Sequence, residues 1–316
     1  MALRMIRPES DAAYRLASET DGKVHCSLGV MAVNEAANMG NCLTSLLNQR
    51  LTNVAIEEII VVVSGSTDGT AAIVDEFSRR DARIQLVEQA QREGKASAVN
   101  LFLRLSQYPV TVLVGADTIL HPDTLEHLVS PFLDPEVGMT GGHPVPTNDP
   151  HSFMGFAAHL LWGLHHQLAL KHPKLGELIA FRRIFERIPA YSAVDEASIE
   201  TLVCGQAYQM RYVPEALVFN RGPATVADFL KQRRRIYAGH VRLKQIQGYH
   251  VATMSGARIL ATLLANPVWH WRWFALTPAI IALEVWGRCL GFYDVHFANQ
   301  AHTVWDLAVS TKKVEN

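Results

Sequence analysis

Cysteine is scarce in this sequence, and the cysteines present are widely separated. The chain of 316 residues has four of them, at positions 26, 42, 204 and 289, and none forms a C-x-x-C pair. Disulfide-stapled modules and structural zinc sites both require cysteines at short, repeated spacings. We therefore expect neither, and predict four reduced thiols of the kind found in cytoplasmic proteins.

An excess of basic charge is also missing. Lysine and arginine number 29 and aspartate and glutamate 30, which gives a formal net charge of −1 at pH 7. Because domains that bind nucleic acids usually carry a strongly basic surface, we expect no nucleic acid among the partners.

The first 22 residues lack an apolar segment, so we expect no secretion signal and interpret residues 1–22 as a polar N-terminal leader. The sequence has no internal repeat and no low-complexity tract. Hydrophobic residues make up 49% of the chain and charged residues 19%, a balance that is typical of proteins with a large core.

Apolar, β-branched runs alternate with helical patterns from residue 24 to about residue 145. We expect strands at 24–33, 57–63, 83–89 and 110–117, and helices at 42–51, 70–80 and 94–107. This alternation predicts an α/β fold with a mostly parallel central sheet flanked by helices. Ligands of such sheets bind outside the carboxyl ends of the strands. Polar residues follow these ends here: Asn34 and Glu35, the segment 64–68, and Asp117.

Three of these polar sites suit a phosphate-containing ligand. The turn V-S-G-S-T-D-G-T at 63–70 can hold a polar ligand at a helix N-terminus, or simply cap the helix. Lys95 can neutralise a phosphate, or be an ordinary exposed lysine at the start of a helix. Asp117 can bind a divalent cation that bridges diphosphate oxygens, or cap a helix that begins near residues 121–123.

Two charged segments follow. Asp195 and Glu196 are adjacent acids before a helical pattern, where one of them can act as a general base or both can favour the helix dipole. The segment K-Q-R-R-R at 231–235 can bind phosphate or headgroups, or form a solvated face.

The last block contains four of the six tryptophans, at positions 269, 271, 273 and 286. Its uncharged core, residues 273–283, is shorter than the roughly 20 residues needed to span a bilayer. Tryptophans flanked by Arg272 and Arg288 favour a helix that lies in the membrane interface. The alternative is a hydrophobic helix that covers the globular core.

In this order, the motifs resemble those of family 2 glycosyltransferases with the GT-A fold, over residues 24–245. Residues 31–35 resemble P-x-x-N-E without the proline, and residues 63–70 resemble D-D-G-S-T-D-G-T with Ser64 in place of the acid that binds the base. Gly94, Lys95, Ala98 and Asn100 match G-K-x-x-A-x-N, whereas residues 115–117 keep only the second acid of D-x-D. Residues 194–196 resemble the T-E-D motif, and Gln232, Arg235 and Ile236 resemble Q-x-x-R-W without the tryptophan.

The resemblance implies an inverting, metal-dependent glycosyltransferase with a Rossmann-like sheet and a C-terminal helical, membrane-associated appendage. It would move a sugar from a nucleotide-sugar, with a UDP-sugar favoured, to a lipid-linked or polysaccharide acceptor. It would act at the cytoplasmic face of the membrane as a peripheral or monotopic protein. We expect a nucleotide-sugar-binding half at 23–145, an acceptor-binding and catalytic half at 146–250, and interfacial helices at 251–316.

The resemblance also implies roles for individual residues. Nucleotide-sugar contacts are expected from Ala32, Asn34, Glu35, Ser64, Ser66, Asp68, Lys95, Asn100 and Ala116. Asp117 would bind Mg²⁺ or Mn²⁺, and Gln232, Arg234, Arg235 and Trp162 would contact the acceptor or the diphosphate. Asp123, Glu177, His165 and His166 would help to shape the acceptor pocket. His159, His165 and His166 are not expected to share a metal, because neighbouring histidines on a helix face apart.

Either Asp195 or Glu196 would be the general base. The spacing to the following Y-V-P favours Glu196, whereas the shorter arm and the residue type of the family favour Asp195, which we prefer slightly.

Two other classes of protein fit less well. A GT-A-fold scaffold that has lost turnover would explain Ser64 and Gly115, but not the retained acids, Lys95 and the Gln-x-x-Arg motif. A nucleotidyltransferase would carry a basic, glycine-rich loop directly after the first strand, where this chain has V-N-E-A-A-N-M-G-N.

Overall fold

Runs of buried β-branched residues form the central strands. The computed structural model describes residues 22–190, 194–248, 255–266 and 270–298. Strands β1 (Val24–Ala32), β2 (Val54–Ser64) and β4 (Val110–Gly115) are buried over most of their length. Strands covered on both faces have nearly continuous apolar sequences, which explains why the sequence predicts these three.

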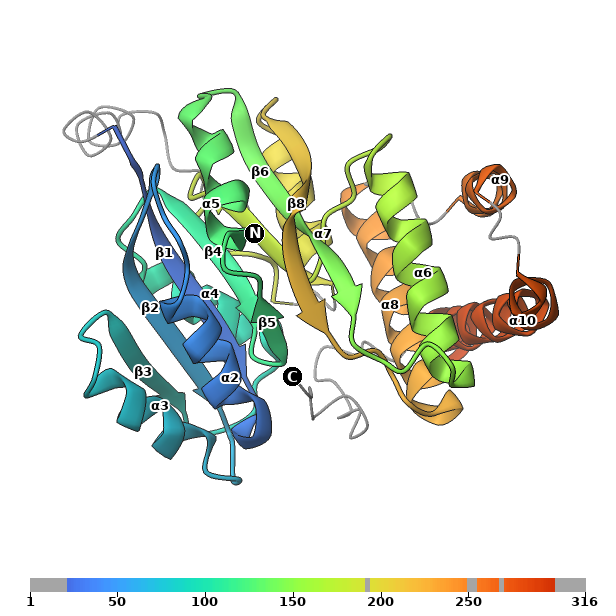
Figure 1. Ribbon diagram of the computed structural model, residues 1–316, viewed down its shortest axis with the longest axis horizontal. Coiled ribbons are helices and arrows are strands. Elements are labelled where there is room, and N and C mark those ends of the chain that lie inside the picture. Colours follow the sequence, from blue (N-terminus) through green and yellow to red (C-terminus); the bar gives the residue numbers. More distant parts are fainter. Residues whose placement is uncertain (1–21, 191–193, 249–254, 267–269, 299–316) are drawn as a thin grey trace.

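The sheet has eight strands in the order β3-β2-β1-β4-β7-β6-β8-β5 (Figure 1). The remaining strands are β3 (Ile84–Gln89), β5 (Thr118–Leu120), β6 (Val137–Pro146), β7 (Leu178–Arg182) and β8 (Gln209–Asn220). Strand β7 is antiparallel to β4 and β6, and β5 is antiparallel to β8, whereas the other pairs are parallel. Six of the eight described strands therefore run in one direction, as predicted.

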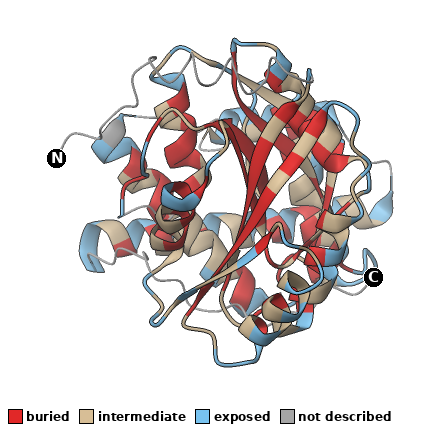
Figure 2. Cartoon of the chain, turned by 90° about the vertical axis from the view of Figure 1, so that its left-hand side faces the viewer, coloured by how far each residue is buried: buried red, intermediate tan, exposed pale blue. Residues whose placement is uncertain are grey.

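Helices cover both faces of the sheet, so that its strands are largely buried (Figure 2). Helices α2 (Ala36–Leu47), α3 (Thr70–Ser78) and α5 (Thr124–Val129), with the 3₁₀ turn η1 (Ser130–Leu133), share one core with the strands. Helices α4 (Lys95–Leu105) and α7 (Asp195–Cys204) belong to the other core. This mixed, helix-flanked sheet confirms the predicted fold class.

Three long helices lie together beside β6 and β8 (Figure 1). They are α6 (Phe153–Ala169), α8 (Val226–Gln247) and α10 (Trp271–Tyr293), and α9 (Gly256–Ala265) packs on α6. Glycines let α10 approach α8 closely, since a Cβ atom on Gly291 would lie 2.6 Å from the carbonyl oxygen of Arg234. Helix α10 therefore packs tightly against α8. The domain divisions at residues 145 and 250 stay predictions.

Helix α10 is longer than the uncharged core at 273–283 that the sequence singles out. It continues through Pro278 and contains three charged residues, Arg272, Glu284 and Arg288. Their side chains have hydrogen-bond or ion-pair partners within the protein. Arg288 binds Glu284 on the same helix at 2.9 Å, and Arg272 donates to the carbonyl oxygen of His151 at 2.6 Å. The segment Trp271–Ala298 is long and apolar enough to cross a membrane by length and composition.

Candidate active site

A cavity of about 530 Å³ lies at the carboxyl ends of β1, β2 and β4, and α6 and α8 form its other wall. Of the residues predicted for the site, it is lined by Ala32, Glu35, Ser64, Lys95, Ala116, Asp117, Trp162, Glu196, Gln232, Arg234 and Arg235. Glu177 and His165 line it as well. The edge of the sheet expected from the sequence is therefore the edge that carries the cavity.

The loops after β1 and β2 are tied together by their own polar groups. Asn34, in a left-handed conformation with φ 53°, accepts a hydrogen bond from the Thr67 amide at 2.9 Å, and its own amide donates to Ser66 Oγ at 2.9 Å. Asp68 accepts from the Ala36 amide at 3.0 Å. Asn34, Ser66 and Asp68 lie outside the cavity lining. Their hydrogen bonds stabilise the two loops, and the nucleotide-sugar contacts expected of them stay predictions.

Ser64 occupies the position of the family's base-binding acid and is buried at the end of β2. Its hydroxyl donates to the side-chain oxygen of Gln89, whose amide donates to Ser97 Oγ at 3.0 Å. Ser97 Oγ in turn donates to Glu93 Oε2 at 2.6 Å. At position 64 itself, a neutral hydroxyl thus replaces the carboxylate that the resemblance would place there.

Lys95 joins the N-termini of α4 and α7. Its ammonium group lies 2.8 Å from Glu196 Oε1 and 3.3 Å from Asp195 Oδ2. The side chain of Asp195 is fully buried, whereas that of Glu196 is 23% exposed. In this structure Lys95 contacts both acids and also lines the cavity, and its expected contact with a phosphate stays a prediction.

These charges shift one another's ionisation. Burial raises the pKa of Asp195 above its usual value, and the nearby Lys95 only partly offsets this. Burial also acts to raise the pKa of Glu196, but the shorter contact with Lys95 prevails and holds it well below its usual value. Glu196 is therefore the more acidic of the two carboxylates and stays ionised at neutral pH, and it is the one that faces the cavity.

Asn100 was predicted to contact the nucleotide-sugar, and the structure places it outside the cavity lining. Its amide donates to the carbonyl oxygen of Ile188 at 3.0 Å and its side-chain oxygen accepts from the Ile188 amide at 2.8 Å. Asn100 thus holds the segment that leads to Asp195 and Glu196.

Two acids face the cavity from neighbouring strands. Asp117 follows β4, and Glu177 precedes β7, which pairs antiparallel with β4. Glu177 has a φ of 59° and sits in a tight turn closed by a hydrogen bond from the Leu178 amide to the carbonyl oxygen of Gly176, at 2.7 Å. Burial, and then the charges of Asp117 and Glu196, raise the pKa of Glu177 to about 7.

Asn220 lines the same part of the cavity and was missed by the sequence reasoning. It ends β8, and the signal that could have found it is the one used for Asp117, a polar residue directly after an apolar strand. Within the described residues, no group of three or more His, Cys, Asp or Glu side chains is arranged to hold a metal ion.

The basic cluster of α8 is divided between two partners. Arg234 forms a bidentate ion pair with the buried carboxylate of Asp294. Asp294 is the first residue of the π-helical segment Asp294–Ala298, which follows α10. Arg235 is half-buried near Glu196 and Glu177, and this burial lowers its pKa to about 10. Asp294 thus neutralises Arg234, whereas Arg235 lies near the acids of the cavity, and the diphosphate contacts expected of both arginines stay predictions.

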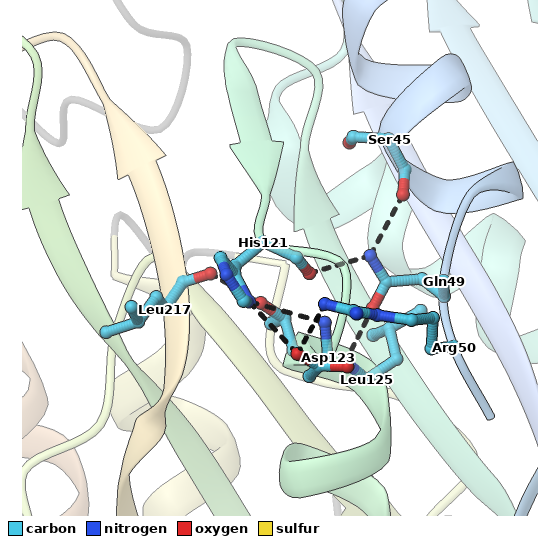
Figure 3. Close-up of polar contacts among 8 residues, drawn as sticks. Ser45, Gln49, Arg50, His121, Asp123, Leu125 and Leu217 are labelled. Carbon is cyan, nitrogen blue, oxygen red and sulfur yellow. Dashed lines mark hydrogen bonds and ion pairs between the residues drawn. The ribbon is translucent and has the colours of Figure 1, made fainter. Parts of the chain in front are cut away.

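Asp123 does not belong to the cavity, contrary to our prediction. Its carboxylate binds Arg50 at 2.8 Å and lies 3.6 Å from His121 Nδ1, in a network at the C-terminal end of α2 (Figure 3). It precedes the first residue of α5. Asp117 is therefore not the residue that caps this helix.

The histidines of α6 have separate environments. Trp162 and His165 both line the cavity and meet edge to face, with ring centroids 5.4 Å apart. His166 turns away, stacks on His143 at 4.1 Å and bonds Tyr212 Oη at 2.8 Å. His159 contacts the carbonyl oxygen of Asn148 at 2.9 Å. The three histidines of α6 thus have different partners.

The family model described as "Glycosyl transferase family 2" matches residues 27–201. The chain belongs to this family. The match begins within β1 and contains the loops that hold Asn34 and Ser66, Asp117, and both acids of α7.

Curated relatives of this family 2 glycosyltransferase include the poly-β-1,6-N-acetyl-D-glucosamine synthase of Staphylococcus epidermidis. It is 25% identical over 215 residues, which cover 64% of this chain and 51% of the synthase. The glycosyltransferase GlyG of Streptococcus pneumoniae serotype 4 is 29% identical over 102 residues, 32% of this chain and 33% of GlyG. The chain thus spans about half the length of the staphylococcal synthase that it matches.

Among solved structures, the chain is similar to the mannosyltransferase PcManGT of Pyrobaculum calidifontis, a complex with GDP-Man and Mn²⁺. The TM-score is 0.59 at 22% sequence identity, and the match covers 90% of this chain and 88% of the other. This likeness confirms the fold of the family 2 glycosyltransferase.

Lys95→Met leaves the acids of α7 without their cation. We expect the free energy of unfolding at pH 7 to fall by about 3–5 kcal/mol, the usual cost of removing one partner of a buried ion pair. As a control, Arg79→Met, which breaks an exposed ion pair with Asp75, should cost less than about 1 kcal/mol. Urea unfolding followed by circular dichroism measures both.

The loss should also depend on pH. The depressed pKa of Glu196 gives stability that is present above the unfolded pKa of a glutamate, about 4.3, and is lost as the pH falls through the folded value. In Lys95→Met this contribution is absent, so the difference from wild type should shrink as the pH falls from about 4 to about 2. A constant difference over this range would contradict the electrostatic role of Lys95.

Proposed function

We propose that this glycosyltransferase moves a sugar from a nucleotide-sugar, with a UDP-sugar favoured, to a polysaccharide or lipid-linked acceptor, with inversion at the anomeric carbon. The observation that carries the proposal is one cavity with Asp117 at the end of β4 and the ionised Glu196 at the start of α7. The names of the relatives support it, since one is a polysaccharide synthase and the structural neighbour holds GDP-Man and Mn²⁺.

Asp117 suits a divalent cation. Its carboxylate faces the cavity directly after a buried strand, and a hard cation is commonly held by one or two carboxylates together with substrate phosphates. Bound there, Mg²⁺ or Mn²⁺ would neutralise charge on the departing nucleoside diphosphate. Arg235 lies on the opposite wall, where its positive charge favours the same leaving group.

We propose Glu196 as the general base, which reverses the slight preference for Asp195 drawn from the sequence. Asp195 is fully buried and lies outside the cavity lining, so an acceptor hydroxyl cannot reach it. Glu196 is partly exposed to the cavity and Lys95 keeps it ionised. The acceptor oxygen would attack the anomeric carbon while the bond to the diphosphate breaks, and its proton would pass to Glu196.

A thermal-shift screen of nucleoside diphosphates and their sugars, with Mn²⁺ or Mg²⁺, tests donor and metal together. A true ligand at about 100 times its dissociation constant should add about 2.7 kcal/mol of apparent stability. We expect Asp117→Ala to lose the metal-dependent part of this gain, and Asp75→Ala, on the exposed face of α3, to keep it. If no nucleotide stabilises the wild-type protein, a scaffold without turnover becomes the better interpretation.

Glu196→Gln and Asp195→Asn separate the two acids once a donor is known. A general base typically contributes 10²–10⁴ in rate, so Glu196→Gln should lower kcat by about that factor with little change in donor affinity. Asp195→Asn should mainly change stability, because its side chain is buried beside Lys95. Similar, modest losses of kcat in both variants would mean that neither acid is the base.

We further propose that α9 and α10 rest on the cytoplasmic face of the membrane, as a peripheral or monotopic attachment. Large apolar side chains are exposed along this surface: Leu260, Leu264, Trp271, Phe274, Ile281, Val285, Trp286, Phe292, Tyr293 and Phe297. An exposed patch of this kind is typical of a membrane or protein interaction site. Trp269, which we also assigned to the interface, lies outside the described residues. Arg272 and Arg288 bind within the protein, so apolar burial would supply most of the affinity.

Liposome flotation of the full chain tests this surface. Trp271 and Trp286 are 72% and 57% exposed, so replacing both with serine should reduce flotation strongly without unfolding the protein. Leu133→Ser removes an equally exposed apolar side chain on η1, away from the surface of α9 and α10, and should leave flotation unchanged. Equal flotation of all three proteins, or none for any, would favour a helix that only covers the core.

A further inference from the structure

We propose that Glu177 and Asn220 complete the divalent-cation site of Asp117, so that the site is built from three strand ends. This inference rests on the proposed function and deepens it, because it replaces the missing first acid of the D-x-D motif with residues from elsewhere in the chain. The expectation from the sequence gave Glu177 to the acceptor pocket and did not include Asn220.

The pairing of β4 with β7 brings Glu177 close to the end of β4, the strand that Asp117 follows. The register runs from Val110 opposite Arg182 to Val114 opposite Leu178. Gly115, where the family has its first acid, and Glu177 each lie one residue beyond the last pair, Val114 and Leu178. Glu177 belongs to the turn before β7, with a φ of 59°. A carboxylate from this turn is therefore available beside the position where β4 lacks one.

The space next to Gly115 is already used by Asp117. A Cβ atom on Gly115 would lie 2.8 Å from Asp117 Oδ1. Any side chain at 115 would thus displace the Asp117 carboxylate from its present position. With Asp117 folded over the glycine, the second carboxylate has to come from another strand.

Asn220 supplies a third oxygen and an independent observation. The pairing of β5 with β8 sets Asn220 opposite Thr118, the residue after Asp117. Asn220 is only 7% exposed and lines the cavity, and no hydrogen-bond donor among the described residues reaches its Oδ1 atom. A buried amide oxygen without a donor is costly, and amide oxygens are ordinary ligands of hard cations.

The charge of the site agrees with a cation. Asp117 and Glu177 bring two carboxylates to the lining of one cavity. Two carboxylates and one amide oxygen, together with diphosphate oxygens and water, give the all-oxygen environment that Mg²⁺ and Mn²⁺ prefer.

Titration of Mn²⁺ into the full-length protein tests the inference without any need for turnover. Electron paramagnetic resonance follows free Mn²⁺ in the presence of UDP or GDP, whichever the screen selects. We expect Glu177→Gln to weaken Mn²⁺ binding by about 10–100-fold, as changes beside a metal site commonly do, and Asn220→Ala to weaken it less. Glu215→Gln, at an exposed position of the same strand β8, should bind Mn²⁺ like the wild type.

The outcomes separate this inference from the proposed function. Wild-type Mn²⁺ affinity in both Glu177→Gln and Asn220→Ala would overturn the inference, and a loss of transfer in the same Glu177→Gln protein would return Glu177 to the acceptor pocket. If wild-type protein binds nucleotide equally well with and without Mn²⁺, metal dependence itself fails. Thermal unfolding without metal provides the folding control, and Glu177→Gln should be no less stable than wild type, because it removes a repulsive charge.

Discussion

The chemistry of the cavity depends on the contact of Lys95 with the two acids of α7. Lys95 and Glu196 are 101 residues apart in sequence, and their contact joins the nucleotide-side helix α4 to the start of α7. Without the ammonium group, two adjacent carboxylates would be brought into a largely buried site, which is unfavourable for both. With it, one acid can be fully buried and the other can stay ionised at the cavity wall. The hydrogen bonds of Asn100 to Ile188 support the same arrangement from the other side of the segment before α7.

Much of the fold could be predicted because three of the four predicted strands, β1, β2 and β4, are continuous apolar runs, the pattern of strands covered on both faces. The strands that were not assigned have a different character. Strand β6 contains three glycines and two prolines, residues that are depleted in strands. Strand β8 contains a proline and several polar residues. Asn220 escaped notice because a polar residue at a strand end is informative only after the strand, here β8, has been recognised. The extent of α10 was underestimated because its charged residues are balanced by partners that no local pattern reveals, such as the carbonyl oxygen of His151.

The sequence predicted which residues lie near the site better than it predicted what each of these residues does. The motif of Asn34, Ser66 and Asp68 correctly marks the edge of the sheet that carries the cavity. The side chains themselves form hydrogen bonds between the loop after β1 and the loop after β2. The competition between Asp195 and Glu196 could not be resolved from type and spacing, because burial decides it. The arginines of α8 look equivalent in sequence, yet neighbouring positions on a helix point in different directions. Arg234 therefore meets Asp294 while Arg235 meets the acids of the cavity.

The close packing of α10 on α8 also has a geometric consequence for a protein held at a surface. Gly287 and Gly291 face α8 across a contact too narrow for a Cβ atom, and the ion pair of Arg234 with Asp294 closes the same contact. A helix fixed in this way cannot act as a loose tether. With α10 resting on a membrane as proposed, the cavity would stand at a constant height and tilt above the lipid headgroups. An acceptor anchored in that membrane would then enter the cavity only if its headgroup were long enough to span this height. The protein would thus select acceptors by the length of their headgroups.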